Sequence, residues 1–240
     1  MTDEEKRWLV VGIAMNKEAA PVLRDFIKQE MNTHYTNLDA YCSGLTPGCT
    51  LKTLTRHQVT ADRTLKRLKF QNINNNLHLH GKSTSRYNYS INDPVELAKL
   101  YLPDYLAQFS AFDESLDISA ILRLLGFTNP APIFPSPYPS IPIQFSADDV
   151  RENVRNKWGH CNLSDWTEAF FKDCFLKLKT LVNSLGLPVG KETTILDRLS
   201  DWQTKGIEIF LLLSGNMLAY AFKPQQNVAI ILLNGLENLT

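Results

Sequence analysis

The chain has 240 residues, enough for one sizeable hydrophobic core, or for a core domain with a small appendage. Its four cysteines are too few for a disulfide scaffold, and 25 basic residues balance 25 acidic ones. Net charge therefore favours neither a nucleic acid nor a membrane as partner. The N-terminus shows no secretory signal, which predicts a cytoplasmic protein with free thiols.

The first predicted element is an amphipathic helix over residues 5–31, where apolar side chains recur every three or four positions. Pro21 interrupts this pattern and predicts a kink or break near residues 19–21. Residues 33–50 are rich in turn-forming side chains and are predicted to be a loop. A second helical stretch is predicted over residues 51–70.

A polar loop is predicted at residues 72–76. Asp93 and Pro94 then have the pattern of a helix N-cap and a first helical residue. A further helix is expected over residues 113–125, with Gly126 as its C-cap. The helices predicted up to this point all have apolar residues at helical rather than strand spacing.

Six prolines lie between residues 129 and 143. Proline fixes one backbone angle and lacks an amide donor, so this segment is predicted to be a stiff loop between two helices. A docking peptide for a proline-binding module is the alternative. Ser146 and Asp149 then have capping-box spacing, which predicts a helix from Ser146 to about Trp158.

The strongest helical pattern covers residues 165–185 and is terminated by Gly186. The sequence therefore predicts an all-α fold. The tail from residue 188 to 240 has apolar runs at 207–222 and 228–233. The first run is short and contains polar side chains, so a packed helix or hairpin is favoured over a membrane anchor.

One short motif carries the chemistry. Residues 155–160 form an R-N-x3-H pattern of Arg155, Asn156 and His160, between two predicted helices. A turn at Gly159 would bring His160 back beside Arg155, whereas one more helical turn would place Asn156 and His160 on the same face. Either geometry can gather a cation, an amide and an imidazole.

These three groups suit RNA cleavage without a metal. Histidine can accept or donate a proton near neutral pH, so His160 could deprotonate a ribose 2′-hydroxyl or protonate the leaving 5′-oxygen. Arg155 could stabilise the phosphorane, and Asn156 could orient the phosphate or the histidine. The structural alternative is an Arg155 that pairs with an acid and a His160 that is an ordinary helix-end residue. The helical context of the motif favours the functional interpretation.

Other candidate RNA contacts lie inside the motif and in a basic segment. Residues 51–90 contain eight basic residues against one acidic residue, a local charge of +7, with aromatic side chains between them. A solvated basic face is the alternative. The candidate RNA-binding residues are Lys66, Arg67, Lys69, Lys157 and Trp158. Trp158 and Trp166 could instead be core residues. No metal site or cofactor is predicted.

Residues 150–168, VRENVRNKWGHCNLSDWTE, followed by Phe170 and Phe171, resemble the R-N-x3-H region of a known family. These are the HEPN domains named after the DAZ-interacting zinc-finger ubiquitin ligase, which is an RNA-binding ligase. Segments at residues 7–21 and 112–122 are also similar to members of this family. The resemblance covers about residues 6–187, which implies a HEPN domain over that range and a separate tail at 188–240.

The resemblance implies a helical bundle that forms a homodimer with two motifs facing one cleft. It also implies a metal-independent endoribonuclease with Arg155, Asn156 and His160 as catalytic residues. The alternative is a non-catalytic RNA-binding or dimerisation module in innate-immune or ubiquitin signalling. A third possibility is that the chain is a fragment of a larger protein. The chain lacks the cysteine pattern of a RING domain, so ligase activity is not transferred to it.

Overall fold

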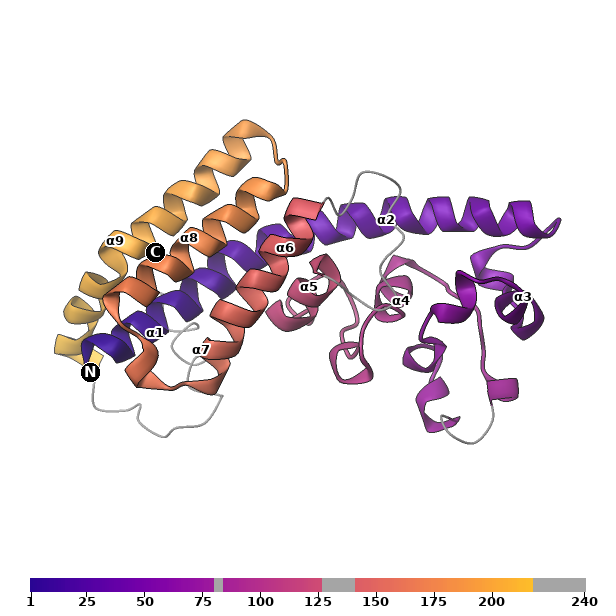
Figure 1. Cartoon of the computed structure of the whole chain (residues 1–240), viewed down its shortest axis with the longest axis horizontal. Helices are drawn as coiled ribbons and strands as arrows, with labels where there is room; N and C mark the ends of the chain where they lie inside the picture. Colours follow the sequence, from indigo (N-terminus) through magenta and orange to yellow (C-terminus); the bar gives the residue numbers. More distant parts are fainter. Residues whose placement is uncertain (80–83, 127–140, 218–240) are drawn as a thin grey trace. The chain divides into compact units, whose positions relative to one another are not determined.

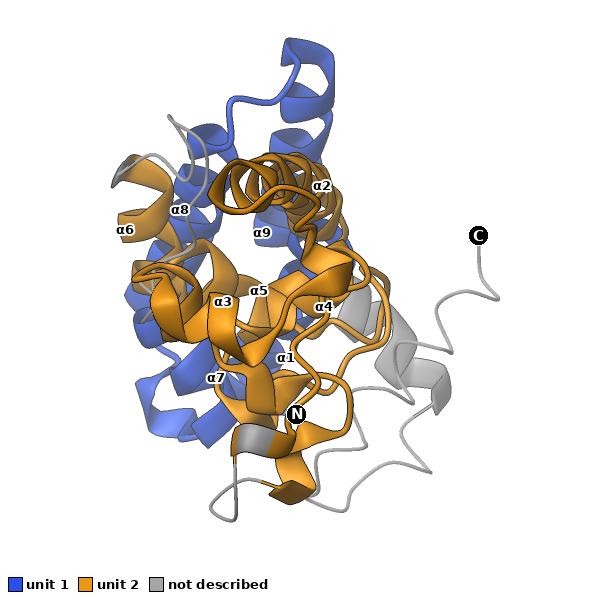
Figure 2. Ribbon diagram, turned by 90° about the vertical axis from the view of Figure 1, so that its right-hand side faces the viewer, with its two compact units in different colours: residues 1–20, 152–240 blue, residues 21–151 orange. Residues whose placement is uncertain are grey.

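The computed structural model describes residues 1–79, 84–126 and 141–217 (Figure 1). Within these ranges the regular elements are helices and no strand is present, which confirms the predicted all-α class. The chain divides into two compact units (Figure 2). Unit 1 contains residues 1–20 and 152–240, and unit 2 contains residues 21–151.

Unit 1 is assembled from helices of both chain ends. Its long helices are α1 (Asp3–Ile13), α8 (Glu168–Ser184) and α9 (Val189–Met217), which run beside one another and pack pairwise (Figure 1). The shorter elements are the π-helix η1 (Ala14–Ala19), the π-helix η8 (Arg151–Arg155, whose first residue belongs to unit 2), α7 (Asn156–His160) and the 3₁₀ helix η9 (Leu163–Asp165).

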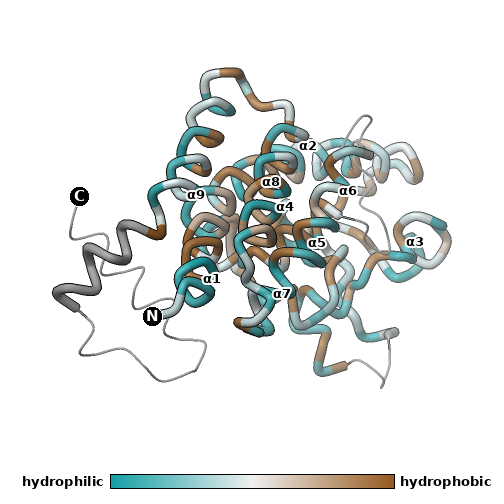
Figure 3. The backbone as a smooth tube through the Cα atoms, turned by 60° about the vertical axis from the view of Figure 1, so that its left-hand side comes forward, coloured by the Kyte–Doolittle hydropathy of each residue, from teal (hydrophilic) through white to brown (hydrophobic). Residues whose placement is uncertain are grey.

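The packing of α9 on α1 is close enough to require glycine at one point. A Cβ atom added to Gly206 would lie 2.8 Å from Cγ1 of Val10, inside normal contact distance. Further along, Trp202 Nε1 donates a 3.1 Å hydrogen bond to Glu18 of η1, and Arg198 lies 3.6 Å from the same carboxylate. Hydrophobic and hydrophilic stretches alternate along the helices, as expected for amphipathic packing (Figure 3).

Unit 2 combines one long helix with many short ones. The α-helices are α2 (Ala20–Leu45, whose first residue belongs to unit 1), α3 (Arg56–Ala61), α4 (Pro94–Lys99), α5 (Ile118–Leu125) and α6 (Ile141–Val150). The 3₁₀ helices are η2 (Leu51–Thr53), η3 (Leu65–Arg67), η4 (Phe70–Asn72), η5 (Asn76–Leu79), η6 (Thr84–Arg86) and η7 (Asp104–Leu106).

Unit 2 is held together by apolar packing and by a few side chains that satisfy buried carbonyl groups. Arg24 on α2 donates from Nε to the carbonyl of Leu116, at 2.9 Å. Asn76 is buried and donates to the carbonyls of Phe70 and Asn88, each at 2.8 Å. These hydrogen bonds hold the irregular parts of the backbone in this unit. A carbonyl group that is buried loses its hydrogen bonds to water and needs a donor within the protein instead.

Several predicted boundaries are confirmed. The Asp93 side chain accepts a hydrogen bond from the Glu96 amide at 2.8 Å, so it caps α4 with Pro94 as the first helical residue. Gly126 is the C-cap of α5. Gly186, with φ of +63°, follows α8, whose last residue is Ser184. The helix predicted from residue 113 begins five residues later, after the Asp117 cap.

The loop predicted at residues 33–50 was wrong for most of its length, because α2 continues to Leu45. Met31, Leu38 and Cys42 are all buried at helical spacing, so burial of this face outweighs the poor helix propensity of the polar residues between them. The single helix predicted over residues 51–70 was also wrong. It is divided into short helices because its apolar positions are too sparse to support one face.

The chain stays helical through Pro21, but the type of helix changes just before it. The π-helix η1 directly precedes α2, and proline is the second residue of α2. Proline has no amide to donate to the carbonyl four residues earlier, and a π-helix is one way to accommodate that missing bond. The predicted irregularity is therefore present as a change of helix type.

The prediction that Ser146 caps a new helix was wrong, because Ser146 lies inside α6, which begins at Ile141. The last part of the predicted proline-rich loop at 129–143 is therefore helical. Pro142 is the second residue of α6, where its missing amide costs nothing. Residues 127–140 of that loop lie outside the described residues.

The predicted division at residue 187 does not coincide with the observed units. The helix α9 packs against α1, η1 and α8, so the first part of the predicted tail belongs to unit 1. Among the residues that the structure describes, no helix is long and apolar enough to cross a membrane. Of the two predicted apolar runs, residues 208–222 and 228–233 lie outside the residues whose side chains the structure describes.

His34 on α2 makes unit 2 sensitive to acid. Its ring is 2% exposed, and Nε2 lies 2.7 Å from the hydroxyl oxygen of Tyr101, with which it shares a hydrogen bond. Burial lowers the pKa of His34 from its usual 6.5 to about 4. Between these two pH values the unfolded chain binds a proton that the native His34 does not bind, so stability is complete above pH 6.5 and is lost as the pH falls towards 4.

The expected loss from His34 is about 3 kcal/mol over that interval. A His34→Phe variant keeps an aromatic ring beside Tyr101 but cannot titrate, so its stability should fall less between pH 6.5 and 4 than that of the wild type. Urea unfolding at several pH values measures the difference. His57→Phe, at an exposed position, is the control. Equal pH slopes for the wild type and His34→Phe would contradict the assignment.

Candidate functional site

The R-N-x3-H motif lies in unit 1 at a change of helix type. Arg155 is the last residue of the π-helix η8, and Asn156 is the first residue of α7. A π-helix bonds each amide to a carbonyl five residues away rather than four, and such insertions are frequent at functional sites. The motif therefore begins where the backbone is locally irregular.

The helix does not turn at Gly159. Residues 156–160 stay helical, and the chain leaves the helix at Cys161, which has a left-handed conformation with φ of +49°. Of the two geometries considered from the sequence, the continued helix is the one observed. Asn156 and His160 then lie on the same face of α7, while Arg155 and His160 are about 140° apart around the helix axis.

The Arg155 side chain reaches along α7. It is half-buried, its Nη1 donates a 3.3 Å hydrogen bond to Oδ1 of Asn156, and the same nitrogen lies 3.8 Å from the position that a Cβ atom on Gly159 would take. The guanidinium thus extends one turn towards His160. Among the described residues no carboxylate pairs with Arg155, so its charge is left for another anion.

His160 is exposed at the end of α7. No hydrogen bond or ion pair joins its imidazole to any residue in the described ranges. Both ring nitrogens are therefore open to a ligand, and no neighbouring side chain fixes the tautomer. A general acid or base needs this access to the group that exchanges the proton.

Lys157 and Trp158, the two other candidates in the motif, have different environments. Lys157 is exposed, with its Nζ 5.0 Å from the ring centroid of Phe170. Trp158 is half-buried and stacks on Trp8 of α1, with ring centroids 5.7 Å apart and planes 14° from parallel. Trp8 also donates from Nε1 to the Trp158 carbonyl at 2.9 Å. One face of the Trp158 indole is thus covered, and base stacking on this residue stays a prediction.

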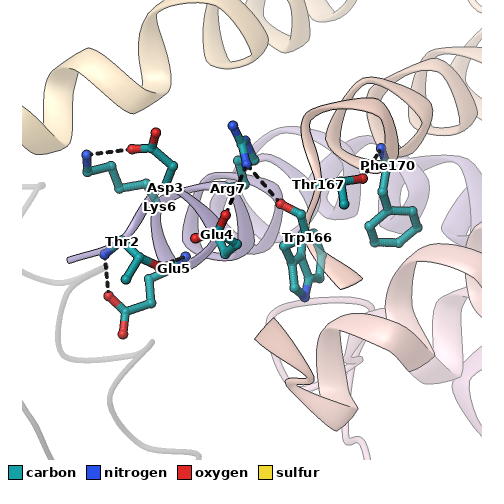
Figure 4. Close-up of polar contacts among 9 residues, drawn as sticks. All are labelled: Thr2, Asp3, Glu4, Glu5, Lys6, Arg7, Trp166, Thr167 and Phe170. Atoms are coloured by element: carbon teal, nitrogen blue, oxygen red, sulfur yellow. Dashed lines mark hydrogen bonds and ion pairs between the residues drawn. The ribbon is translucent and has the colours of Figure 1, made fainter. Parts of the chain in front are cut away.

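The segment after the motif is anchored on α1 (Figure 4). Arg7 donates from Nη1 to the carbonyl of Trp166 at 3.1 Å, and the Thr167 hydroxyl accepts from the Phe170 amide at the start of α8. Trp166 is fully buried, with its ring 5.1 Å from that of Phe170. The core role considered for Trp166 is confirmed by this burial.

The supports of the motif were missed from the sequence. Arg7 and Trp8 contact a segment about 150 positions away, a separation that no periodicity indicates. Gly12 could have been identified from the sequence, because an isolated glycine within a helical pattern often marks a place where another segment packs closely against the helix. A Cβ atom at this position would lie 2.4 Å from Nε1 of Trp158.

Gly12→Ala is expected to destabilise the protein. Displacing the Trp158 indole from α1 costs about 1–3 kcal/mol as an overpacked contact, which outweighs the helix propensity gained from alanine. Chemical unfolding followed by circular dichroism measures the change. The matched control is Gly159→Ala, because a Cβ there makes only ordinary contact and the residue is exposed and helical. That variant should gain up to about 1 kcal/mol. A destabilised Gly159→Ala would instead indicate a turn at this residue.

The basic candidates of the other segment belong to unit 2. Lys66 and Arg67 are exposed on η3, and Lys69 is half-buried just after it. The motif on α7 belongs to unit 1. Within the described ranges, no group of three or more histidine, cysteine, aspartate or glutamate side chains is placed to hold a metal ion.

Comparison of the chain with protein-family models, with curated proteins and with solved structures gives no match. The resemblance to HEPN domains therefore stays an expectation from the motif and its surroundings.

Proposed function

We propose that the chain is a HEPN-type protein that binds RNA and cleaves it without a metal at Arg155, Asn156 and His160. One observation carries this proposal. Arg155, a half-buried cation without a carboxylate partner in the described structure, reaches along a short helix towards an exposed histidine that is also unpartnered. A cation of this kind favours a bound phosphate, and the nearby imidazole can exchange protons with it.

In the proposed reaction, the ribose 2′-oxygen attacks the adjacent phosphorus and the bond from phosphorus to the 5′-oxygen breaks. The products are a 2′,3′-cyclic phosphate and a 5′-hydroxyl group, so no water is consumed in this step. His160 takes the proton of the 2′-hydroxyl or gives one to the leaving oxygen. Arg155 stabilises the charge on the phosphorane, and Asn156 holds the guanidinium through its Oδ1 atom.

One motif supplies one imidazole, whereas the reaction needs both a base and an acid. A homodimer with two motifs facing one cleft would provide a second histidine, and this is the assembly that we propose. Size-exclusion chromatography with light scattering measures the mass in solution. A strictly monomeric protein that nevertheless cleaves RNA would contradict the dimer and leave the catalytic motif in place.

The test of cleavage uses labelled single-stranded RNA and purified protein in an excess of EDTA. The expected result is cleavage with cyclic phosphate ends, while RNA carrying 2′-O-methyl groups remains intact because it lacks the attacking hydroxyl. Absence of cleavage, or cleavage only after a divalent metal is added, would remove the catalytic proposal.

A non-catalytic RNA-binding or dimerisation module, in innate-immune or ubiquitin signalling, is the second candidate. The observation that favours it is the position of His160, which has no orienting partner in the described residues and lies about 140° from Arg155 around α7. In that case RNA binding should survive His160→Ala and weaken in Arg155→Gln, with no product formed by either protein or by the wild type.

A further inference from the structure

Residues 52–69 of unit 2, which we call the basic segment, present their charged side chains to solvent. The apolar residues in and beside the segment are buried: Leu51, Leu54, Val59, Leu65 and Leu68. The basic residues between them are exposed: Lys52, Arg56, Arg63, Lys66 and Arg67. This alternation arises because the short helices η2, α3 and η3 each bury one side, and α3 packs against η3. Five exposed positive charges therefore lie within residues 52–67, each one or two positions from a buried apolar residue.

The one acid within residues 52–69 is Asp62, whose charge acts on Lys66 without forming an ion pair with it. Among the described residues, none of the five exposed cations takes part in an ion pair. The segment has six basic residues and one acid, Asp62, which leaves a charge of +5. The Asp62 carboxylate is already engaged, since it accepts from the Thr64 and Leu65 amides at 2.8 Å each and from the Tyr41 hydroxyl at 2.7 Å.

At its inner end the segment includes a further cation, Lys69. Lys69 is half-buried, and its amide donates to the Leu100 carbonyl at 3.1 Å, which fixes this end against α4. Burial first, and then the charge of Arg123 on α5, lower the pKa of Lys69, while Asp104 acts in the opposite direction. Neither cation has a hydrogen-bonded side-chain partner in the described part of the chain. An added anion would relieve this repulsion.

We infer that the basic segment is a second nucleic-acid-binding surface, which contacts the phosphate backbone through Lys66 and Arg67. It lies in unit 2, whereas the motif on α7 belongs to unit 1, and its binding needs no cleavage. The inference rests on the proposed function only in the choice of RNA as the probe. Unpaired cations bind a nucleic acid through release of its counterions, so binding must weaken with salt in proportion to the phosphates contacted.

A nucleic acid fits this surface better than a lipid membrane does. Binding to a membrane surface usually combines basic residues with large apolar side chains that insert between the headgroups. Between residues 51 and 69 no large apolar side chain is exposed. Three of the exposed cations are arginines, whose guanidinium groups can bind phosphate oxygens in pairs.

The test measures binding of a fluorescent 2′-O-methyl RNA, which cannot be cleaved, by the full chain at several salt concentrations. Lys66→Gln with Arg67→Gln is expected to lower the slope of log Kd against log salt by about 1.4, the value for two lost phosphate contacts on a single strand. The matched control is Lys172→Gln with Lys205→Gln. It removes the same charge from exposed lysines that are already paired with Glu168 and Asp201, and its slope should stay close to that of the wild type.

Equal slopes for the two double variants would overturn the inference and leave a solvated basic face. Binding of phosphatidylserine vesicles that depends on Lys66 and Arg67, without binding of RNA, would also overturn it. The two proposals fail separately. Cleavage of RNA by the wild type, together with equal salt slopes for the two double variants, contradicts only the second surface, and a wild type that binds through Lys66 and Arg67 without cleaving contradicts only the nuclease.

Discussion

His160→Ala is expected to lower the rate of RNA cleavage by about 10²–10⁴-fold, the usual contribution of a positioned proton-transfer group. Among residues 155–160, the exposed His160 imidazole is the group that can exchange a proton with ribose or with the leaving oxygen. Because His160 is exposed and has no partner in the described residues, its loss should change the stability by less than about 0.5 kcal/mol. The effect should therefore fall on catalysis rather than on folding.

Single-turnover cleavage of labelled RNA in EDTA measures this effect. His78→Ala, which removes another exposed histidine outside residues 52–69, is the matched control and should cleave at the wild-type rate. Arg155→Lys keeps the charge but loses the paired guanidinium geometry, so it should also be slow. If His160→Ala cleaves as fast as the wild type, the activity belongs to another site or to a contaminant.

Trp166→Ala is expected to lower the free energy of unfolding by about 3–5 kcal/mol, the usual cost of deleting a large buried aromatic side chain. Trp166 is fully buried between the motif and α8, with its ring against Phe170. The Arg7 hydrogen bond is made to the backbone carbonyl, so alanine keeps that bond and loses the packed ring. The predicted cost thus comes from the cavity rather than from a broken polar contact.

Trp166→Phe distinguishes ring packing from polar loss. The buried Nε1 of Trp166 has no hydrogen-bond partner in the described structure, so phenylalanine gives up volume but no bond, and its cost should be well below that of alanine. Tyr105→Ala, at a residue that is 74% exposed, should change stability by less than about 0.5 kcal/mol. Urea unfolding compares the three variants. Equal losses for alanine and phenylalanine would contradict the packing argument.

Local signals in the sequence predicted local structure well. The Asp93–Pro94 start, the Gly126 cap and the amphipathic pattern of α8 each depend on side chains within a few residues, and each was found. Ser146 failed although its spacing was right, because a cap is used only where a helix begins, and burial of Ile143 inside α6 favours an earlier start.

The candidate site was predictable in part. The residues Arg155, Asn156 and His160 were identified from the sequence, but the helix that continues through Gly159 was only one of two options. Glycine permits a turn without requiring one, and a helical residue at this position is stable when its neighbours are helical. The supports from α1 were not predictable, since the contacts of Arg7 and Trp8 depend on how distant segments pack.

Unit 1 is built from two segments that lie far apart in the sequence, and this has a consequence for its synthesis. Trp8 and the Trp158 carbonyl that it binds are 150 positions apart, and unit 2 occupies the chain between them. At about 5–20 residues per second, a ribosome needs roughly 8–30 s to make that interval. During this time α1 lacks the helices α7, α8 and α9 that pack against it in unit 1, whereas the residues of unit 2 are already present. We therefore expect unit 2 to be able to fold first, and unit 1 to form only after α8 and α9 have been synthesised.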